Sequence, residues 1–303
     1  MTYYMKSKIE SATFNSVNIL FLTVLMFITL YPFWNTIAVS FNNATDTTRG
    51  GITFRPREFT LQNYRAVFSS GTIYNAFFIS VARTVIQTVS GVFLTSMLAY
   101  ALSRREFVLR KPFTVIIVLS MYINAGLIPN YFLIRSLGMI NTFWVYIIPG
   151  MISAFNFIVI RTYMSNLPES IIESARIDGC GDFVIFSRII LPLCLPVLAT
   201  IALFIAVGAW NAWFDTMIYN SRMANLHTLQ YKLMEYLQSS QNQAKSAAAI
   251  GAMGMAQDAA SSMVTPVSIR AAITVVAALP ILAVYPFLQR YFVTGISIGG
   301  VKE

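Results

Sequence analysis

The residues best suited to specific binding chemistry lie in one polar stretch, Glu169–Pro192, of an otherwise very apolar chain. Glu169, Glu173 and Arg176 are spaced i, i+4 and i+7, so in a helix they would share one face. The opposite face of that helix would be apolar and would carry Ile171, Ile172 and Ala175. We therefore expect a short amphipathic helix that lies on a membrane domain by one face and meets a partner in water through the other.

Helix-terminating residues divide this stretch into two short helices. Asn166 can cap the first helix, and Pro168 suits its first turn, where no backbone donor is needed. Gly179 stands where a helix commonly ends on a left-handed residue. Asp182 can cap the second helix, which runs apolar to Pro192. The sequence thus predicts two helices joined by a glycine turn.

Catalytic and metal-binding chemistry find no support in the sequence. It has no H-E-x-x-H or G-x-S-x-G motif and no pair of intramembrane aspartates, so we expect no catalytic residue. The single histidine, His227, leaves no room for a histidine-based metal site and is expected at the surface of a loop. Cys180 and Cys194 lack metal-ligand spacing and are interpreted as small buried residues.

Composition indicates a membrane protein. Of the 303 residues, 56% are hydrophobic and 11% are charged, and the mean hydropathy is +0.65. A soluble domain has about a quarter of its residues charged. The net charge of +9 is typical of cytoplasmic loops that face anionic lipid. Nucleic-acid binding is the weaker interpretation, because no basic patch interleaved with aromatic residues occurs. We expect an all-α, polytopic membrane protein.

Gaps between charged residues locate the membrane spans. Each uncharged run of about 19 residues or more can cross roughly 30 Å of hydrocarbon as a helix. The six predicted spans lie near residues 16–41, 74–103, 113–134, 143–163, 192–214 and 267–288. We interpret the first as a retained span, because no small-residue cleavage pattern follows it.

The short loops orient these spans. The link between the second and third spans carries Arg104, Arg105, Arg110 and Lys111. The next link holds only Arg135, so the positive-inside rule places the first link in the cytoplasm. Six spans would then put both termini and the polar stretch on that same side.

The spacing within the polar stretch resembles the EAA loop of ABC importer permeases. Glu173-Ser174-Ala175 is followed by Gly179 and then by Ile189-x-Leu191-Pro192, with every spacing kept. In that family the loop is a coupling helix that docks into a cleft on the ATPase subunit. The sugar-importer form reads E-A-A-x-I-D-G-A, and here Ser174 and Cys180 stand where alanines are usual. The resemblance implies the type I ABC importer permease fold and assigns ATPase coupling to Glu173, Ser174, Ala175, Ile177, Asp178, Gly179 and Pro192.

The resemblance extends over nearly the whole chain. The N-A-G-L-I-P break at 124–129 and the Y-P-F-L-Q-R-Y-F run at 285–292 are similar to the branch that serves oligosaccharides released from polysaccharides. The glycine-rich tail resembles the end of the smaller maltose-permease subunit, which reaches into the ATPase dimer. By that resemblance Gly299 and Gly300 would contact the ATPases, with close backbone approach permitted by glycine.

The implied organisation has three parts. Residues 1–73 form an N-terminal tail, the first span and an outer loop. Residues 74–288 form a transport core of five spans, which includes the coupling loop 165–192 and the outer segment 215–266. Residues 289–303 form a cytoplasmic tail.

Four residues are candidates for the substrate pathway. Trp210 and Asn211 end the fifth span and could bind sugar through an aromatic face and an amide. They could equally belong to an interfacial aromatic belt. Asn124 and Gly126 lie in a break of the third span, where freed backbone groups can line a cavity. Arg83, near the outer end of the second span, is either functional or snorkels to the interface.

The resemblance also implies the partners. These are a second homologous permease, two cytoplasmic ABC ATPases, an extracytoplasmic solute-binding protein and an oligosaccharide, assembled in a bacterial cell membrane. ATP and Mg would bind the ATPases, since this chain has no G-x-x-x-x-G-K-[ST] loop and is expected to be no enzyme and to hold no cofactor. A permease for a non-sugar solute is one alternative. An ion-coupled secondary transporter is less favoured, because the predicted spans hold no Asp or Glu at mid-depth.

Overall fold

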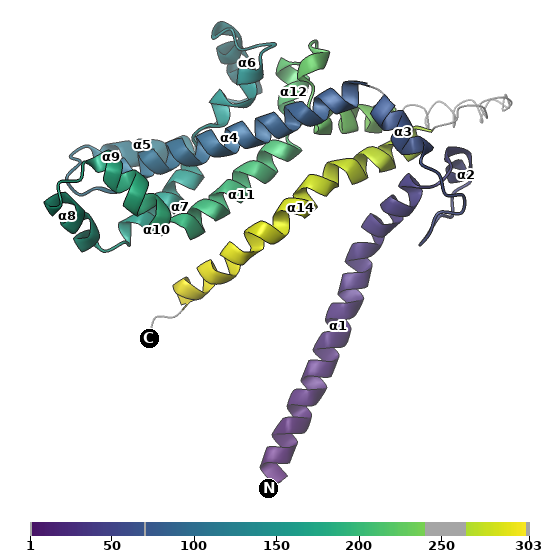
Figure 1. The fold of residues 1–303 in the computed structure, drawn as a ribbon, viewed down its shortest axis with the longest axis horizontal. Helices are drawn as coiled ribbons and strands as arrows, with labels where there is room; N and C mark the ends of the chain where they lie inside the picture. The colour runs from purple at the N-terminus through teal and green to yellow at the C-terminus, as the bar shows by residue number, and fades with distance from the viewer. Residues whose placement is uncertain (1, 70, 240–264, 301–303) are drawn as a thin grey trace. The chain divides into compact units, whose positions relative to one another are not determined.

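The computed structural model describes residues 2–69, 71–239 and 265–300, and these residues are mostly helical (Figure 1). Apart from helices and turns, the described residues contain one isolated bridge, between Asn42 and Phe59. The predicted all-α class is confirmed for this part of the chain.

Four helices of 17 to 39 residues are the longest named helices in the described part of the chain. They are α1 (Thr2–Ser40), α4 (Gly71–Ser103), α11 (Leu195–Asn211) and α14 (Pro266–Gly300). The shorter α-helices are α2 (Ala44–Thr48), α3 (Gln62–Ser69), α5 (Arg110–Ser120), α6 (Leu127–Ser136), α7 (Ala154–Ser165), α8 (Glu169–Ile177), α9 (Asp182–Ile185), α10 (Leu191–Leu193) and α12 (Phe214–Tyr219). Single turns of other helix types are η1 (Phe143–Tyr146), η2 (Ile148–Gly150), η3 (Phe186–Ile190) and η4 (Ala224–Leu226). Residues 229–239 are also helical.

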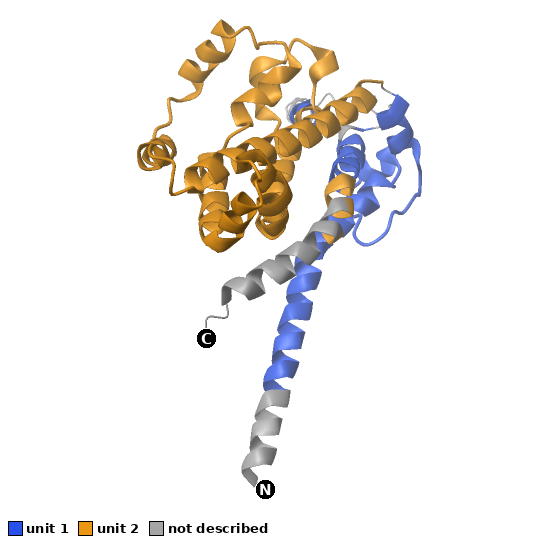
Figure 2. Ribbon diagram, turned by 60° about the vertical axis from the view of Figure 1, so that its left-hand side comes forward, with its two compact units in different colours: residues 1–70, 235–278 blue, residues 71–234, 279–303 orange. Residues whose placement is uncertain are grey.

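The chain divides into two compact units (Figure 2). Unit 1 comprises residues 1–70 and 235–278, and unit 2 comprises residues 71–234 and 279–303. The candidate coupling helix α8 belongs to unit 2.

Two buried asparagines organise unit 1. The Nδ2 of Asn42 donates to Asp46 at 2.9 Å, and its Oδ1 accepts from two backbone N–H groups of the following loop, at 2.8 and 3.0 Å. Asn63, on α3, donates to the backbone carbonyls of Ser40 and Asn42 at 2.9 and 2.8 Å. Because buried polar groups require partners, these bonds fix the end of α1 against the loop and α3.

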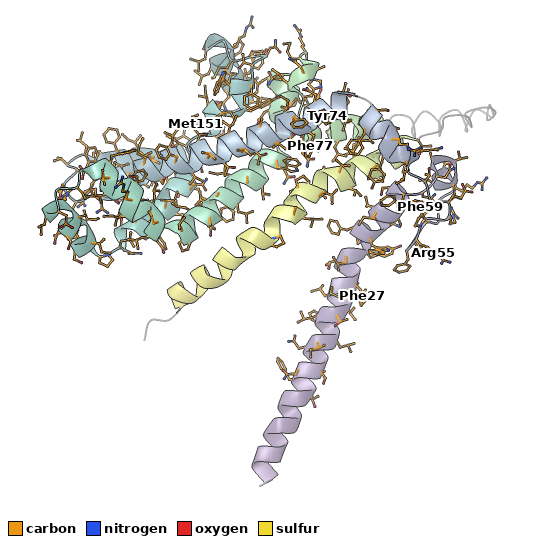
Figure 3. The ribbon with its side chains drawn as sticks, in the orientation of Figure 1. Phe27, Arg55, Phe59, Tyr74, Phe77 and Met151 are labelled. Atoms are coloured by element: carbon orange, nitrogen blue, oxygen red, sulfur yellow. The ribbon has the colours of Figure 1, made fainter. Side chains whose placement is uncertain are left out.

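α1 is apolar and exposed along most of its length within the described chain. Residues 13–34 are all exposed, and Phe27, labelled in Figure 3, is 66% exposed. An apolar surface of this length fits a membrane span. Pro32 lies inside α1 without ending it, although proline removes one helical hydrogen bond.

α4 packs along α11 and α7 and forms the core of unit 2. Phe157 on α7 and Ile201 on α11 are fully buried in this core. Gly91 allows α4 to approach its neighbours: a Cβ there would lie 3.2 Å from the Ile205 side chain and 3.5 Å from the Met151 carbonyl. Small residues at helix crossings let the backbones come close in this way.

The six-span count is not confirmed in the described residues. Two helices there are long and apolar enough to cross a membrane, Thr13–Ser40 and Gly71–Ser103. Two bent pairs, if each is one broken span, raise the number to four: Phe143–Gly150 with Ala154–Ser165, bent by 46°, and Asp182–Leu193 with Leu195–Asn211, bent by 83°. The span expected at 113–134 is divided into α5 and α6, because the chain leaves the helix after residue 120 and resumes it only at Leu127.

The 83° bend falls at Cys194, between two prolines. It follows the π-helical turn η3, and proline and π-turns are known causes of sharp bends. Cys194 is fully buried, and its N–H donates to the carbonyl of Ile190 at 3.0 Å. Pro192, one of the predicted coupling residues, lies in α10 just before this bend.

Candidate functional site

α8 ends in a Schellman turn. The N–H of Cys180 donates to the carbonyl of Ala175 at 3.0 Å, and the N–H of Gly179 donates to the carbonyl of Arg176 at 2.9 Å. Gly179 has a φ of +81°, and an added Cβ would meet nothing within 4 Å. Glycine is therefore required here for its backbone conformation and not for space. The predicted glycine turn is confirmed.

The starts of the two loop helices differ by a residue or more from the prediction. Pro168 occupies the N-cap position of α8 and provides no side-chain cap, whereas Asn166 follows the end of α7. Gly181 precedes α9, so that Asp182 is the first residue of that helix. Asp182 still places a negative charge at a helix start, where the helix dipole favours it.

α8 buries one face and exposes the other. Ile172 and Ala175 are 4% and 6% exposed and belong to the core of unit 2. The exposed residues of the helix end are Glu173, Ser174, Ile177, Asp178 and Gly179. Ile177 is 86% exposed. Among the predicted coupling residues of α8, Ala175 therefore packs the helix and the other members form its outer surface.

Two charged residues expected to face a partner instead bind the chain's own loop. Arg105 Nη1 lies 3.3 Å from Glu169 Oε2. Arg176 pairs with Glu106, and its Nη2 lies 3.1 Å from Asp182 Oδ1. The hydrogen bond from Arg176 lowers the pKa of the Glu106 carboxyl and raises the pKa of Arg176 itself. Neither pairing could be read from the spacing along α8 alone.

A second polar site lies in unit 2 between α4, α6, η1, η2 and α12. It is a cavity of about 540 Å³ whose polar lining includes Arg83, Gln87, Asn130, Tyr146, Asp215 and Tyr219. Arg83 is only 2% exposed and pairs with Asp215. Its guanidinium also donates to the Ala212 carbonyl at 3.3 Å and lies 4.7 Å above the Tyr146 ring. Arg83 is thus held inside the protein, which excludes the snorkelling interpretation.

Hydrogen bonds connect this cavity wall to α12 and η4. The Tyr146 hydroxyl lies 3.0 Å from Thr216 Oγ1 and donates to the Leu226 carbonyl at 2.8 Å. The Nε of Arg83 and the Oε1 of Gln87 are buried and have no hydrogen-bond partner within the described residues. The wall of the cavity therefore contains buried polar groups whose hydrogen-bonding capacity the described residues leave unused.

Sequence reasoning missed Asp215 and Tyr146 as members of this cavity. The one available signal was that Arg83 and Asp215 are each an isolated charge at the outer end of a predicted span. Two such charges at the same depth are candidates for pairing, because an unpaired charge in the membrane is costly.

Comparison with known proteins gives the family. Residues 91–298 match the family described as the binding-protein-dependent transport system inner membrane component. The chain belongs to this family. The matched residues include α8 and its glycine turn, so the loop singled out by its spacing lies within a recognised permease domain.

Relatives match the permease over nearly its whole length. It is 37% identical over 283 residues to the polygalacturonan/rhamnogalacturonan transport system permease protein YtcP of Bacillus subtilis, covering 93% of this chain and 96% of that one. It is 30% identical to the arabinooligosaccharides transport system permease protein AraQ of Halalkalibacterium halodurans, covering 91% and 92%.

A solved structure shares the permease fold. A chain of a bacterial ABC transporter involved in the import of the acidic polysaccharide alginate superposes with a TM-score of 0.82 at 28% identity, covering 93% of this chain and 97% of that one. The expected type I permease fold therefore has both a sequence and a structural counterpart.

The four predicted pathway residues of the permease take separate local roles. Trp210 is 5% exposed and packs edge-on against Phe77, labelled in Figure 3, with ring centroids 6.1 Å apart. Asn211 is exposed and accepts from Gln230 at 3.1 Å. Asn124 accepts from the N–H of Gly126 at 2.9 Å, and Gly126 takes a φ of +86° before α6. Their contact with substrate stays a prediction.

Two further expectations concern His227 and the tail. His227 is buried, 6% exposed, and its Nε2 lies 3.1 Å from the Ser221 carbonyl, so its predicted surface position was wrong. Its imidazole packs against Tyr231 because the loop folds back onto the helix that follows. Within the described residues, no group of three or more potential metal ligands occurs. Gly299 and Gly300 continue α14, and residues 301–303 lie outside the described part.

Proposed function

We propose that this chain is one of two permease subunits of an ATP-driven, binding-protein-dependent importer of oligosaccharides. The observation that carries the proposal is the outer edge of α8, where Glu173, Ile177 and Asp178 are exposed beside a glycine turn. Membership of the transport family supports the importer class. The relatives named for polygalacturonan and arabinooligosaccharide transport support a sugar cargo.

In this proposal α8 is where the ATPases exert force. The Glu173 carboxylate accepts hydrogen bonds from the ATPase cleft, and the exposed Ile177 side chain fills an apolar part of it. Closure of the two ATPases on ATP and Mg moves α8. Since α8 lies between α7 and α9, its movement reaches the membrane helices. These helices then move as rigid bodies and switch the cavity between inward- and outward-facing states. The end of α14, with Gly299 and Gly300, gives the ATPases a second contact.

We further propose six spans with both termini in the cytoplasm. The contact of Arg105 with Glu169 supports this topology, because it joins the basic link after α4 to the coupling loop. The two loops must therefore lie on the same side of the membrane. The positive-inside rule makes that side the cytoplasm.

The cargo is proposed as an oligosaccharide whose identity is selected by the binding protein. Arg83 does not indicate an acidic cargo, because Asp215 already neutralises its guanidinium. A carboxylate on the sugar would have to displace this internal partner. The polar cavity is better suited to hydroxyl groups, which can bind the remaining donors and acceptors without a net charge.

The coupling role is tested by Glu173→Ala in the importer reconstituted with its ATPases and binding protein. We expect ATP-dependent uptake of labelled arabinan oligosaccharides to be lost, while the ATPases keep basal hydrolysis. Gly179→Asp should act in the same way, because an aspartate at a φ of +81° strains the turn that ends α8.

Glu58→Ala is the matched control. Like Glu173→Ala it removes an exposed carboxylate, but Glu58 lies in unit 1, outside the coupling loop. This variant should transport normally. Normal uptake in both Glu173→Ala and Gly179→Asp, with normal expression, would refute the coupling role.

A further inference from the structure

The loop between α4 and α5 touches α8 at two points. Arg105 pairs with Glu169 at the first residue of α8, with the charged atoms 3.3 Å apart. The adjacent Glu106 pairs with Arg176 in the last turn of α8. We propose that these two ion pairs form a second mechanical connection, parallel to the covalent one, through which movement of α8 reaches α4 directly. This inference rests on the proposed coupling function of α8.

The order of the charges specifies how α8 lies on the loop. Arg105 and Glu106 are neighbours of opposite sign, and their partners Glu169 and Arg176 are seven residues apart. Seven residues are about 10 Å, or two turns, along a helix. If α8 reversed its direction on the loop, like charges would meet at both points. The order of the charges therefore fixes the direction in which α8 runs along the loop, and not only the distance between α8 and the loop.

The loop itself is anchored to the end of α4. Arg104 Nη2 donates to Ser103 Oγ at 3.0 Å, and its guanidinium lies 5.0 Å above the Tyr100 ring. Tyr100 in turn packs against Phe186, with ring centroids 5.4 Å apart. A pull on Arg105 or Glu106 is therefore transmitted to α4, which packs along α7 and α11.

The covalent connection from α8 to the next helix is less rigid. It passes through Gly179 and Gly181, and glycine restricts the backbone least of all residues. Arg176 bridges this turn by binding Asp182 at the start of α9. Arg176 thus connects three segments of unit 2: α8, α9 and the loop after α4. In Figure 1, α8 and α9 lie at the same end of α4 as α5.

The ion pairs between the loop and the last turn of α8 border a cavity. A cavity of about 430 Å³ lies here, lined in part by Tyr100, Arg104, Glu106, Arg176 and Asp182. The Arg176–Glu106 pair at the wall of this cavity joins the loop to the last turn of α8.

These ion pairs contribute to positioning and not to folding. The side chains of Arg105 and Glu169 are 78% and 45% exposed, and those of Arg176 and Glu106 are 34% and 67% exposed. Exposed pairs of this kind add little to the stability of a protein. Charge-altering variants are therefore expected to fold, and their effect should appear in the amount of sugar carried per ATP.

The test is a charge exchange in the importer reconstituted with its ATPases and binding protein. Arg105→Glu and Glu169→Arg alone should each lower the sugar carried per ATP by about two- to fivefold, the range that surface ion pairs support. The double variant Arg105→Glu/Glu169→Arg should restore most of the loss, because it re-forms the pair with reversed signs. Restoration distinguishes positioning through the pair from a general effect of either residue.

Lys111→Glu is the matched control, because it makes the same change from a positive to a negative charge as Arg105→Glu. Lys111 is exposed, lies in the first turn of α5 and takes no part in the two ion pairs with α8. It should leave the ratio of sugar to ATP unchanged. The proposal is overturned if the single variants behave like Lys111→Glu, or if the double variant is no better than the worse single one. In either case, ATP-dependent uptake by the wild type in the same vesicles would still support the permease function. If the wild type itself shows no such uptake, the permease function is refuted instead.

Discussion

Arg83 and Asp215 form an ion pair that joins α4 to α12 across 132 residues of sequence. The two partners differ in exposure: the Arg83 side chain is 3% exposed and that of Asp215 is 39% exposed. The guanidinium keeps further contacts with the Ala212 carbonyl and the Tyr146 ring. The pair therefore fixes α12 to α4, and the cation is the partner that cannot reach water.

This unequal exposure predicts unequal costs of removing the two charges. Asp215→Asn leaves a buried, uncompensated cation, and breaking a buried pair in this way costs about 3–5 kcal/mol. Arg83→Met leaves a carboxylate that water can reach, with a cost of about 1 kcal/mol or less. Thermal unfolding of the assembled transporter in detergent measures both. An equal or larger loss for Arg83→Met would contradict the assignment of Arg83 as the buried partner.

Trp210 and Asn211 are neighbours in the sequence but should respond differently to truncation. Trp210→Ala removes a side chain that is 5% exposed, so we expect a loss of about 3–5 kcal/mol in stability. Asn211→Ala removes an exposed side chain with one side-chain hydrogen bond, to Gln230, and should change stability by less than about 1 kcal/mol. Thermal unfolding and uptake are measured on the same preparations.

Uptake then separates the packing role from the pathway role. If Asn211→Ala lowers uptake without lowering stability, Asn211 belongs to the sugar pathway. If Trp210→Ala retains the wild-type unfolding temperature, the buried position of Trp210 is wrong.

Local sequence signals predicted the local features of α8 and its glycine turn. Gly179 marked the helix end because few other residues take a φ of +81°, and the 3.6-residue period correctly assigned Ile172 and Ala175 to the buried face. These features depend on residues within two helical turns of one another.

Tertiary partners could not be predicted in the same way. The spacing of Glu169, Glu173 and Arg176 placed all three on an outward face, yet two of them bind the loop at residues 105–106. A helical period shows which residues share a face, but it does not show which other segment covers that face. For the same reason the partner of Arg83, far along the chain in α12, was missed.

Span counting was limited by breaks in the helices. The break predicted at Asn124 and Gly126 is confirmed and separates α5 and α6, of 11 and 10 residues, but apolar length alone could not show it. Nor could it show that the chain bends by 83° near Pro192. In both cases local backbone geometry, set by glycine or proline, overrides the uniform hydropathy.

Gly91 is predicted to be the least replaceable glycine of α4. A Cβ at this position lies 3.2 Å from Ile205, a side chain that can shift by a few tenths of an ångström, so Gly91→Ala should be tolerated. Gly91→Leu cannot be accommodated against the Met151 carbonyl and should cost about 1–3 kcal/mol or more through overpacking. Gly208→Leu, on α11, is the control because a Cβ there meets nothing within 4 Å. Equal unfolding temperatures for the two leucine variants would contradict this packing.

Asp46 should make the stability of unit 1 depend on acidity. A hydrogen bond from Asn42, aided by the Arg57 guanidinium at 2.9 Å, holds the pKa of the Asp46 carboxyl below its ordinary value of 3.8. A carboxyl whose pKa is lowered by folding stabilises the protein fully above its unfolded pKa and loses this contribution as the pH falls through the folded pKa. Between about pH 5 and about pH 2, the unfolding temperature should therefore fall more steeply in the wild type than in Asp46→Asn. Glu58→Gln, an exposed carboxylate in the same loop, should retain the wild-type slope, and an equal loss of slope in both variants would contradict the role of Asp46.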